Sequence, residues 1–572
     1  MKATAAGKTS FRAVKTQVPN ESAGQDRMDL LLFHAMKHKP ARLERPLLAI
    51  LLTTLVSLVL AGCQTETRSV STAPYSEPHR LQYHFSQPAN WMNDPNGMVY
   101  YAGEYHLFYQ YYPEDTVWGP MHWAHAVSTD MVHWENLPVA LYPDDLGYIF
   151  SGSAVVDWSN TSGFGTGGQP PLVAIFTYHD PEKAKAETHD HETQGIAYSN
   201  DKGRSWTKYA GNPVIANTEK QNDFRDPKVF WHAPSGKWVM VLSAGDHMEL
   251  WGSPNLKDWH HLSDFGRGLG AQGGVWECPD LIHLPLAGTG ESRWVLIQNI
   301  NPGGPHGGSG TQYFVGQFDG TRFTLDPSFA EDLREEGAVW LDQGRDNYAG
   351  VTWADVPEED GRTLFIGWMG NWDYAQEVPT HPWRSAMTLP RKLTLHRTPE
   401  GLRVFSQPVE ELQQLRVVER EIAPMTVPEG DPVRVALAFP AFQCELLVRF
   451  KLPASGSTDF GLEVSNSKGE RYRIGYSATT GEFYSDRTQA GDASFSETFA
   501  RVHRTPRISE GEVIELHLFF DRASCELFAD GGANVMTDTY FPSEDFDQLR
   551  FYSNGGSVEV VGGQAWPLKG IW

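Results

Sequence analysis

The sequence has very little cysteine, and this scarcity limits the kinds of site that it can build. Its only cysteines are Cys63, Cys278, Cys444 and Cys525. Four such residues exclude a disulfide scaffold, and without a Cys-x-x-Cys pair or a histidine-rich cluster nothing indicates a structural metal site. In an oxidising compartment Cys444 and Cys525 could form a disulfide, but two separate buried thiols fit the sequence equally well.

Basic residues are also scarce. The chain has 47 Lys and Arg against 71 Asp and Glu, which gives a formal net charge of −24. Such an excess of negative charge repels nucleic acid and anionic membrane surfaces, so we expect neither as a partner. A neutral ligand suits this charge, whereas a phosphorylated ligand would need a local basic pocket.

One long apolar run, residues 46–62, follows several basic residues and ends at Leu60-Ala-Gly-Cys63. This order is typical of a secretory signal, and the last four residues resemble a bacterial lipobox. We therefore expect an N-terminal extension and signal peptide over residues 1–62 and a lipid anchor on Cys63. Met36 is a better start for this signal than Met1. The predicted location is the outer membrane or cell surface; the alternatives are a secreted or periplasmic protein, or an uncleaved signal anchor.

Residues 63–79 are polar and predict a tether. From residue 80 to 405 the sequence consists of short β-type runs between Gly, Pro, Asn and Asp, which indicates an all-β domain. A weak repeat, with a Ser, a turn Asp or Asn, and then a Trp, occurs three times: Ser128 to Trp134, Ser199 to Trp206 and Ser253 to Trp259. Repeats at this spacing favour four-stranded propeller blades over a sandwich.

The pattern changes after this domain. Residues 406–420 form the predicted linker helix, because Glu410-Glu-Leu-Gln-Gln-Leu-Arg-Val-Val418 is the one convincing helical stretch. Residues 421–572 contain alternating strands joined by Gly, Asp and Ser turns, which predicts a β-sandwich domain.

Three carboxylates lie among aromatic residues, Arg or Pro rather than in charge runs. They are Asp94 in Trp91-Met-Asn-Asp-Pro-Asn-Gly97, Asp226 in Phe224-Arg-Asp-Pro-Lys228 and Glu277 in Val275-Trp-Glu-Cys-Pro-Asp280. An Asp-Pro step keeps the Asp extended, so its side chain can project from a strand end. Taken alone, Asp94 would more simply be a turn-capping residue.

These three segments resemble, in the same order, the motifs of glycoside hydrolase family 32, which contains invertases, inulinases and levanases. The resemblance extends over about residues 80–572. Further matching segments are Phe108–Pro113, Trp118–Ala126, Phe150–Ser153, Asp346–Ala349, Gly367–Trp372 and Trp383–Arg391. The resemblance implies a five-bladed β-propeller followed by a β-sandwich.

The resemblance also implies roles for the three carboxylates: Asp94 as nucleophile, Glu277 as general acid/base and Asp226 as transition-state stabiliser. An apolar setting should raise the pKa of Glu277, and we expect Arg225 to orient Asp226 and keep it ionised. Sugar contacts implied by the motifs are Asn93, Gln110, Trp118, Phe150, Ser151 and Arg225. Trp91 and Trp372 are candidates either for stacking at the cleft mouth or for core packing. Two carboxylates and water complete such a reaction, so we expect no metal or organic cofactor.

The segment Gly367–Tyr374 resembles exo-acting inulinases and levanases more than sucrose hydrolases. The expected substrate is therefore a fructan or fructo-oligosaccharide, and the sequence leaves levan and inulin both open. The alternatives are a secreted invertase, a fructosyltransferase, and a surface glycan-binding lipoprotein without catalysis.

Overall fold

The computed structural model describes residues 75–453 and 458–572. The predicted signal peptide, the lipidation site Cys63 and most of the predicted tether lie outside the described residues. Within those residues, no helix is both long and apolar enough to cross a membrane. The described residues belong to one structural unit.

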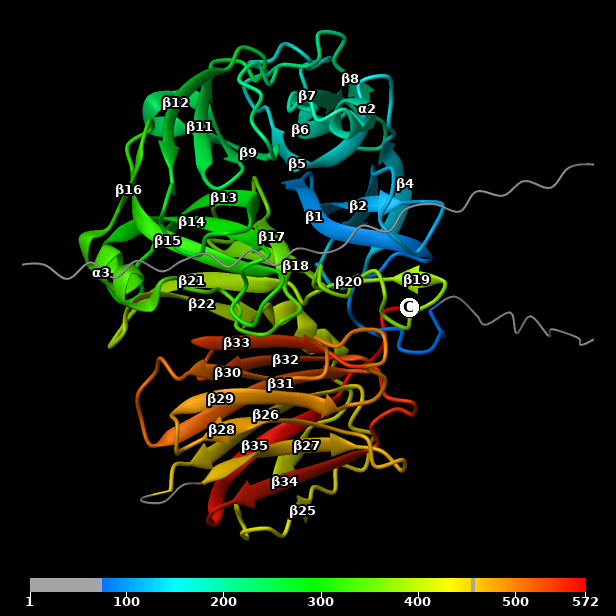
Figure 1. Ribbon diagram of the computed structural model, residues 1–572, viewed down its shortest axis with the longest axis vertical. Coiled ribbons are helices and arrows are strands. Elements are labelled where there is room, and N and C mark those ends of the chain that lie inside the picture. The colour runs from blue at the N-terminus through cyan, green and yellow to red at the C-terminus, as the bar shows by residue number, and fades with distance from the viewer. Residues whose placement is uncertain (1–74, 454–457) are drawn as a thin grey trace, which may run out of the picture. The chain divides into compact units, whose positions relative to one another are not determined.

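Residues 90–408 form five antiparallel sheets, which are the blades of a β-propeller (Figure 1). The first contains β1 (Asn90–Tyr101), β2 (Glu104–Tyr112), β3 (His122–Ser128) and β4 (Glu135–Leu141), with the short β19 (Trp383–Arg384) parallel to β1. The second contains β5 (Tyr148–Val156), β6 (Leu172–His179), β7 (Glu192–Ser199) and β8 (Thr207–Lys208). The third contains β9 (Phe224–His232), β10 (Lys237–Ala244), β11 (Met248–Ser253) and β12 (His260–Phe265). The fourth contains β13 (Val275–Pro285), β14 (Ser292–Asn301), β15 (Gly310–Phe318) and β16 (Phe323–Leu325). The fifth contains β17 (Tyr348–Thr352), β18 (Thr363–Met369), β20 (Ala386–Met387), β21 (Arg391–Thr398) and β22 (Gly401–Pro408). The five-bladed fold implied by the resemblance is confirmed.

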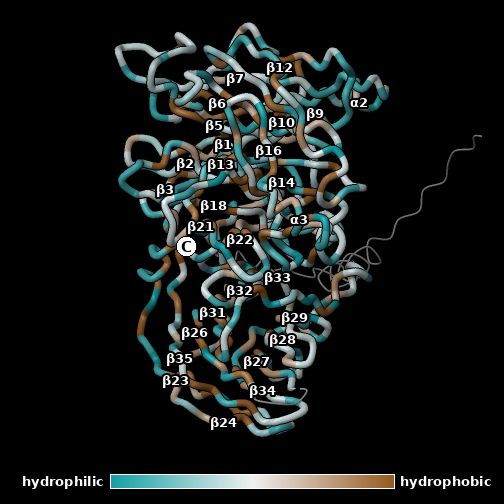
Figure 2. Tube along the Cα trace, turned by 90° about the vertical axis from the view of Figure 1, so that its left-hand side faces the viewer, coloured by the Kyte–Doolittle hydropathy of each residue, from teal (hydrophilic) through white to brown (hydrophobic). Residues whose placement is uncertain are grey.

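Hydrophobicity explains which strands lie inside each blade. The second strands β6 and β10 are almost wholly buried and read as continuous apolar runs, because neighbouring blades cover both faces. The outer strand β4 is mostly exposed or half-buried. Figure 2 shows hydrophobic and hydrophilic residues interleaved along the chain.

The Ser-Asp-Trp repeat is one turn that recurs in three blades. Ser128 Oγ contacts Asp130 Oδ1 at 3.0 Å, and the Trp134 indole donates to the Met131 carbonyl at 3.1 Å. The second copy has the same two bonds, from Ser199 to Asp201 and from the Trp206 indole to the Gly203 carbonyl. The third copy has them from Ser253 to Asn255 and from the Trp259 indole to the Leu256 carbonyl. Each copy joins the third strand of a blade to the fourth, which confirms the interpretation of the repeat as a blade turn.

The remaining strands form two sheets with a shared hydrophobic core, which confirms the predicted sandwich. One sheet contains β23 (Arg420–Ile422), β24 (Met425–Val427), β26 (Cys444–Lys451), β31 (Val513–Asp521), β32 (Ser524–Ala529), β33 (Asn534–Thr539) and β35 (Val558–Pro567). The other contains β25 (Val433–Arg434), β27 (Asp459–Ser465), β28 (Arg471–Ser477), β29 (Glu482–Gln489), β30 (Val502–Pro506) and β34 (Gln548–Asn554). Cys444 and Cys525 lie in this core as free thiols.

Helices are few and short among the described residues. The helix expected at Glu410–Val418 is a 3₁₀ helix, η2 (Glu410–Leu415), so it is shorter and tighter than expected. The others are α2 (Pro181–Lys185), α3 (Pro327–Glu336) and the 3₁₀ turn η1 (Ala233–Ser235). Helix α3 was not predicted, although it has clear end signals: Asp326 caps its first turn, Pro327 opens it and Gly337 ends it.

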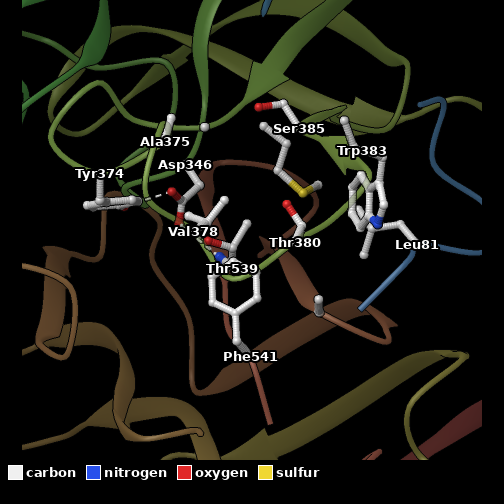
Figure 3. Close-up of a pocket in the computed structure, with 14 residues that line it drawn as sticks. Leu81, Asp346, Tyr374, Ala375, Val378, Thr380, Trp383, Ser385, Thr539 and Phe541 are labelled. Atoms are coloured by element: carbon white, nitrogen blue, oxygen red, sulfur yellow. Dashed lines mark hydrogen bonds between the residues drawn. The ribbon is translucent and has the colours of Figure 1, made fainter. Parts of the chain in front are cut away.

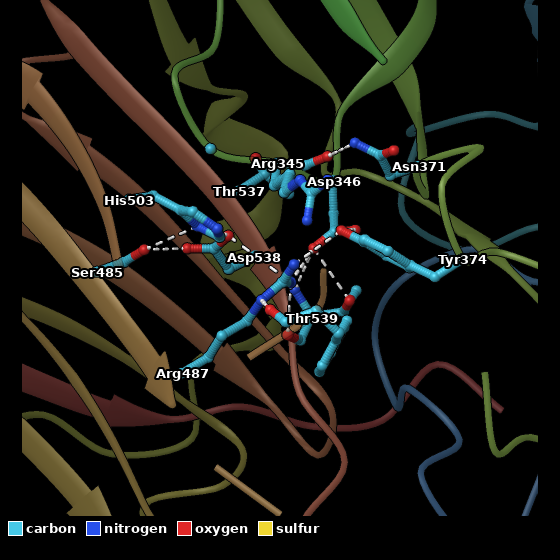
Figure 4. Close-up of polar contacts among 12 residues, drawn as sticks. Arg345, Asp346, Asn371, Tyr374, Ser485, Arg487, His503, Thr537, Asp538 and Thr539 are labelled. Atoms are coloured by element: carbon cyan, nitrogen blue, oxygen red, sulfur yellow. Dashed lines mark hydrogen bonds and ion pairs between the residues drawn. The ribbon is translucent and has the colours of Figure 1, made fainter. Parts of the chain in front are cut away.

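Buried ion pairs join the propeller to the sandwich. Arg391 on β21 contacts Asp342 at 2.9 Å and Glu526 on β32 at 2.6 Å, and all three side chains are buried. Nearby, Asp346 accepts from Arg487 at 2.6 Å and from the Thr539 amide at 2.8 Å (Figure 4). Since a buried charge without a partner is costly, these pairs specify how the two domains meet.

A small cavity of about 40 Å³ lies beside this polar cluster (Figure 3). Apolar side chains from both domains line most of it, including Leu81, Val378 and Phe541. It has room for little more than one water molecule, so we regard it as a packing defect of the interface and not as a ligand site.

Candidate active site

The three predicted carboxylates come from the first strands of three blades. Asp94 is on β1, Asp226 on β9 and Glu277 on β13, each within the first five residues of its strand. Because these strands start at the same end of the propeller, the fold brings the three carboxyl groups together from positions far apart in the sequence.

Cys278 connects two of these carboxyl groups directly. Its thiol lies 3.7 Å from Asp94 Oδ2 and 3.6 Å from Asp226 Oδ2, and its amide donates to Asp226 Oδ2 at 3.0 Å. The backbone of Cys278 has φ = 44°, and the pairing of β13 with β14 shifts register between Glu277 and Asp280. Such a bulge redirects side chains. Here it places Glu277 and the Cys278 amide at the same centre.

Asp94 is held by two donors. The Asn93 amide donates to Oδ1 at 2.9 Å, and the Ser151 hydroxyl donates to Oδ2 at 2.8 Å. Asn93 is itself oriented by the Trp91 indole, which donates to Asn93 Oδ1 at 2.7 Å. Burial raises the pKa of Asp94, while the bonds from Asn93 and Ser151 oppose that rise because they favour the anion.

Glu277 has a different environment. The Tyr348 hydroxyl donates to its Oε2, and Arg225 donates to its Oε1 from Nη2 at 3.1 Å. Burial raises the pKa of Glu277; Arg225 opposes this effect and the nearby charge of Asp94 adds to it. The expected direction of the pKa shift is therefore found, and its main cause is burial as expected.

Asp226 differs from the expectation in its relation to Arg225. We expected Arg225 to orient Asp226 and keep it ionised, but the guanidinium forms its hydrogen bonds with Glu277, Glu192 and Asp223 instead. Burial raises the pKa of Asp226 to about 8; the positive charge of Arg225 opposes this rise, and the negative charges of Glu277 and Asp94 add to it. The reason is geometric: Asp226 has φ = 65°, and this left-handed backbone turns its side chain toward Cys278.

Three further residues of this centre, Glu192, Asp223 and Tyr348, were not predicted from the sequence. Glu192 on β7 is buried and contacts Arg225 at 3.1 Å, and Asp223 contacts it at 2.6 Å. Nothing in the local sequence around Glu192 distinguishes it from a surface acid. Tyr348 was recoverable, because it lies in the matched segment Asp346–Ala349.

The other predicted sugar contacts are Gln110, Trp118 and Phe150. Gln110 is buried, is paired with Asn93 across β1 and β2, and donates to the Ile149 carbonyl at 3.1 Å. Trp118 is exposed, and its ring meets the edge of Phe150 at 6.0 Å. Phe150 stacks on His179 with ring centroids 4.3 Å apart. These rings form one aromatic wall, which is connected to Asp94 through Ser151, the residue after Phe150 and a donor to Asp94.

Of the two less certain tryptophans, only Trp372 can meet a sugar in this structure. Trp91 is fully buried and contacts both Trp372 and Trp368, so the core-packing interpretation applies to it. Trp372 is half-buried, and its ring stacks on Trp91 at 5.6 Å. Trp91 therefore acts indirectly: its indole orients Asn93 and its ring packs against Trp372.

Two side-chain groups in the described part of the chain have ligand atoms close enough to hold a metal ion. They are His179, His191 and Glu192, and His247, Glu249 and Asp264. In each group one member already binds a guanidinium: Glu192 contacts Arg225, and His247 contacts Arg267 at 2.6 Å. We therefore assign neither group to a metal.

Chemically, the site combines three buried carboxyl groups with raised pKa values, and each has different hydrogen-bond partners. Carboxyl groups arranged in this way can catalyse an acid/base-assisted displacement at an acetal carbon.

Comparison with known proteins agrees with this chemistry. The family model "Glycosyl hydrolases family 32 N-terminal domain" matches residues 84–408, and "Glycosyl hydrolases family 32 C terminal" matches residues 411–567. The chain is 47% identical to the levanase of Bacillus subtilis, over 87% of this chain and 72% of the relative. It is 41% identical to the extracellular exo-inulinase of Aspergillus awamori, over 87% and 96% respectively. The crystal structure of exo-inulinase from Aspergillus awamori superposes with a TM-score of 0.80 at 39% identity, covering 87% of this chain and 100% of that one. The two family models together match almost the whole described chain, and the protein accordingly belongs to glycosyl hydrolase family 32.

Proposed function

We propose that this enzyme is a retaining β-fructofuranosidase that releases fructose from the ends of fructan chains. The observation that carries the proposal is the contrast between Asp94 and Glu277. Burial raises the pKa of both groups, but at Asp94 hydrogen bonds from uncharged donors oppose this rise and favour the anion. At Glu277 the negative charge of Asp94 adds to the rise and favours the acid form, although Arg225 opposes it. A retaining glycosidase needs one carboxyl group in each state.

In the first step of the proposed reaction, Asp94 attacks the anomeric C2 of the terminal fructosyl unit. The bond from C2 to the glycosidic oxygen breaks, and Glu277 gives its proton to that oxygen. The product of this step is a fructosyl ester on Asp94. Glu277, now ionised, takes a proton from water, and the resulting hydroxide attacks C2 and frees Asp94.

Asp226 and Arg225 have supporting roles in this scheme. Asp226 lies against Cys278 beside both reacting groups, where its carboxyl group can hydrogen-bond sugar hydroxyls as the ring flattens. Arg225, which contacts Glu277 at 3.1 Å, stabilises the anion that Glu277 becomes after it has given up its proton.

The substrate proposal rests on the aromatic wall and on the relatives. Trp118 and Phe150 in the aromatic wall, and Trp372, which stacks on Trp91, offer flat rings for a neutral sugar chain. The B. subtilis relative is a levanase and the A. awamori relative an exo-inulinase, so both levan and inulin are proposed substrates. Invertase activity on sucrose is the minor alternative.

Time-resolved product analysis on levan and inulin tests this proposal. Exo action predicts fructose as the earliest and only product, and faster release from at least one fructan than from sucrose. Early oligosaccharides would refute exo action. A preference for sucrose would refute fructan specificity and favour the invertase alternative.

We also propose that the protein is exported and anchored through a lipid on Cys63. The support is the order of basic residues, the apolar run 46–62 and the Leu-Ala-Gly-Cys segment. A mature N-terminal peptide that begins with a lipid-modified Cys63 in mass spectrometry would support this proposal. An intact, unmodified peptide that spans Cys63 would refute it.

A further inference from the structure

A second cavity lies at the opposite end of the central strands from the carboxylates. Its volume is about 380 Å³, within the usual range of small-ligand pockets. Side chains at the ends of β5 and β9 line it, together with Ala354 and Asp355, which follow β17. Ser151 and Asp226 lie near the starts of β5 and β9, four to five residues before the lining residues of these strands. At about 3.3 Å per residue, the rise of a strand places the cavity roughly 15 Å from these two side chains.

Two exposed tryptophans flank this cavity. Trp158 is 63% exposed and Trp231 is 42% exposed. Only one other tryptophan, Trp118 at the active site, is exposed among the residues that the structure describes. Single exposed apolar side chains are common, but two exposed indoles that line one cavity indicate a binding surface.

Both rings are held in place before any ligand binds. The Trp158 indole donates to Asp355 Oδ1 at 2.8 Å and contacts the ring of Tyr101 at 5.9 Å. Trp231 meets the buried Trp238 edge-on at 5.2 Å. Rings that are already fixed lose little conformational entropy on binding, as a preformed recognition site requires.

The polar groups of the cavity suit hydroxyl donors. Asp355 accepts from Trp158 and from the Val156 amide, which leaves about half of its acceptor positions open. Asp157 also borders the cavity, but its carboxylate is buried and accepts from Thr161 and Ser162, so Asp355 is the acceptor available to a ligand. No Lys or Arg is among the lining residues. An anionic ligand would be repelled here, whereas a neutral polyhydroxyl ligand with an apolar face would find both stacking surfaces and acceptors.

We propose that this cavity is a second saccharide-binding site, in which Trp158 and Trp231 stack on the sugar rings of a neutral polysaccharide. That the bound polysaccharide is the fructan substrate itself rests on the proposed function above. A polymer held here and at the carboxylates would engage the enzyme at two points, and this raises its apparent affinity without changing the chemical step.

The test is native affinity electrophoresis in gels that contain levan, inulin or dextran. An Asp94→Asn background prevents digestion of the polymer. We expect a Trp158→Ala/Trp231→Ala double variant to bind the retarding polymer about tenfold more weakly or worse. Trp158→Phe keeps a flat ring and should retain most of the binding. Val561→Ala, which changes an exposed side chain of the sandwich, should have no effect. Circular dichroism and thermal unfolding check that each variant folds.

A second readout uses the same tryptophan variants with Asp94 intact. Sucrose hydrolysis should not change, because the cavity lies away from the carboxylates. Unchanged retardation of the double variant by a polymer that retards the parent would overturn the proposal, and so would a parent that none of the polymers retards. The double variant could lose retardation while the parent enzyme releases no fructose from either fructan. This pair of results would support the second binding site and refute the proposed function.

Discussion

Tyr348 offers a test of how the site controls the proton on Glu277. Its hydroxyl donates to Glu277 Oε2, a bond that favours the ionised carboxylate and so lowers the pKa of Glu277. The change Tyr348→Phe removes this bond and leaves Arg225 in place. A hydrogen bond to a charged group contributes about 1.5–3 kcal/mol, and one pKa unit corresponds to about 1.4 kcal/mol. Partial replacement by water reduces the effect, so we expect the pKa of Glu277 to rise by about one unit.

The sign of the effect on activity follows from the role of Glu277. The first step needs the acid form, so activity is lost as pH rises through the pKa of Glu277. In Tyr348→Phe the alkaline limb of the kcat/KM profile should therefore move to higher pH, while the acid limb, which reports Asp94, stays in place.

The assay is initial fructose release at a series of pH values, compared with Tyr313→Phe. Tyr313 is an equally buried tyrosine on β15, and its hydroxyl accepts from the Val404 amide and contacts no carboxylate of the site. Tyr313→Phe should leave both limbs unchanged. An alkaline limb that does not move in Tyr348→Phe, or that moves to lower pH, would refute the assignment of Glu277 as the acid.

Three further predictions follow from other contacts of the structure. Ser151→Ala removes a donor to Asp94, so the pKa of Asp94 should rise by up to about one unit and the acid limb of the pH profile should move upward. Arg391→Met leaves Glu526 without its buried guanidinium, and denaturant titration should show a loss of about 3–5 kcal/mol. The buried His84 contacts Asp521 at 2.8 Å and Glu526 at 3.0 Å. Burial lowers its pKa, but these two carboxylates outweigh that effect and raise it from 6.5 to about 9. The contribution of His84 to stability is therefore complete below pH 6.5 and is lost as pH rises through 9. Thermal unfolding should show this decline in the parent and a flatter curve in His84→Gln; identical slopes would refute it.

Much of the fold could be predicted because its signals are local. The Ser-Asp-Trp turn depends on hydrogen bonds within seven residues, so its three copies are legible in the sequence. The sandwich could be predicted because buried and more exposed residues alternate along its strands, as in the first half of β31. Asp94, Asp226 and Glu277 were found together only because ordered motifs marked them, since each alone resembles an ordinary turn or surface acid.

What could not be predicted depends on contacts between distant segments. Arg225 follows Asp223 and precedes Asp226, yet its partners include Glu192 on another strand and Glu277 on another blade. The burial of Trp91 results from ring contacts with Trp368 and Trp372, which are more than 270 residues away in sequence. No local pattern encodes such pairings.

The central claim is that Asp94 forms a covalent bond with the sugar while Glu277 transfers protons. In a Glu277→Ala variant, a fructoside with a good leaving group no longer needs an acid for the first step, but water is no longer activated for the second. The ester should therefore accumulate. Mass spectrometry of the rapidly denatured protein should then find one fructosyl unit on the peptide that carries Asp94. A fructosyl unit on the Asp226 peptide, or turnover of the same substrate without any adduct, would contradict the account.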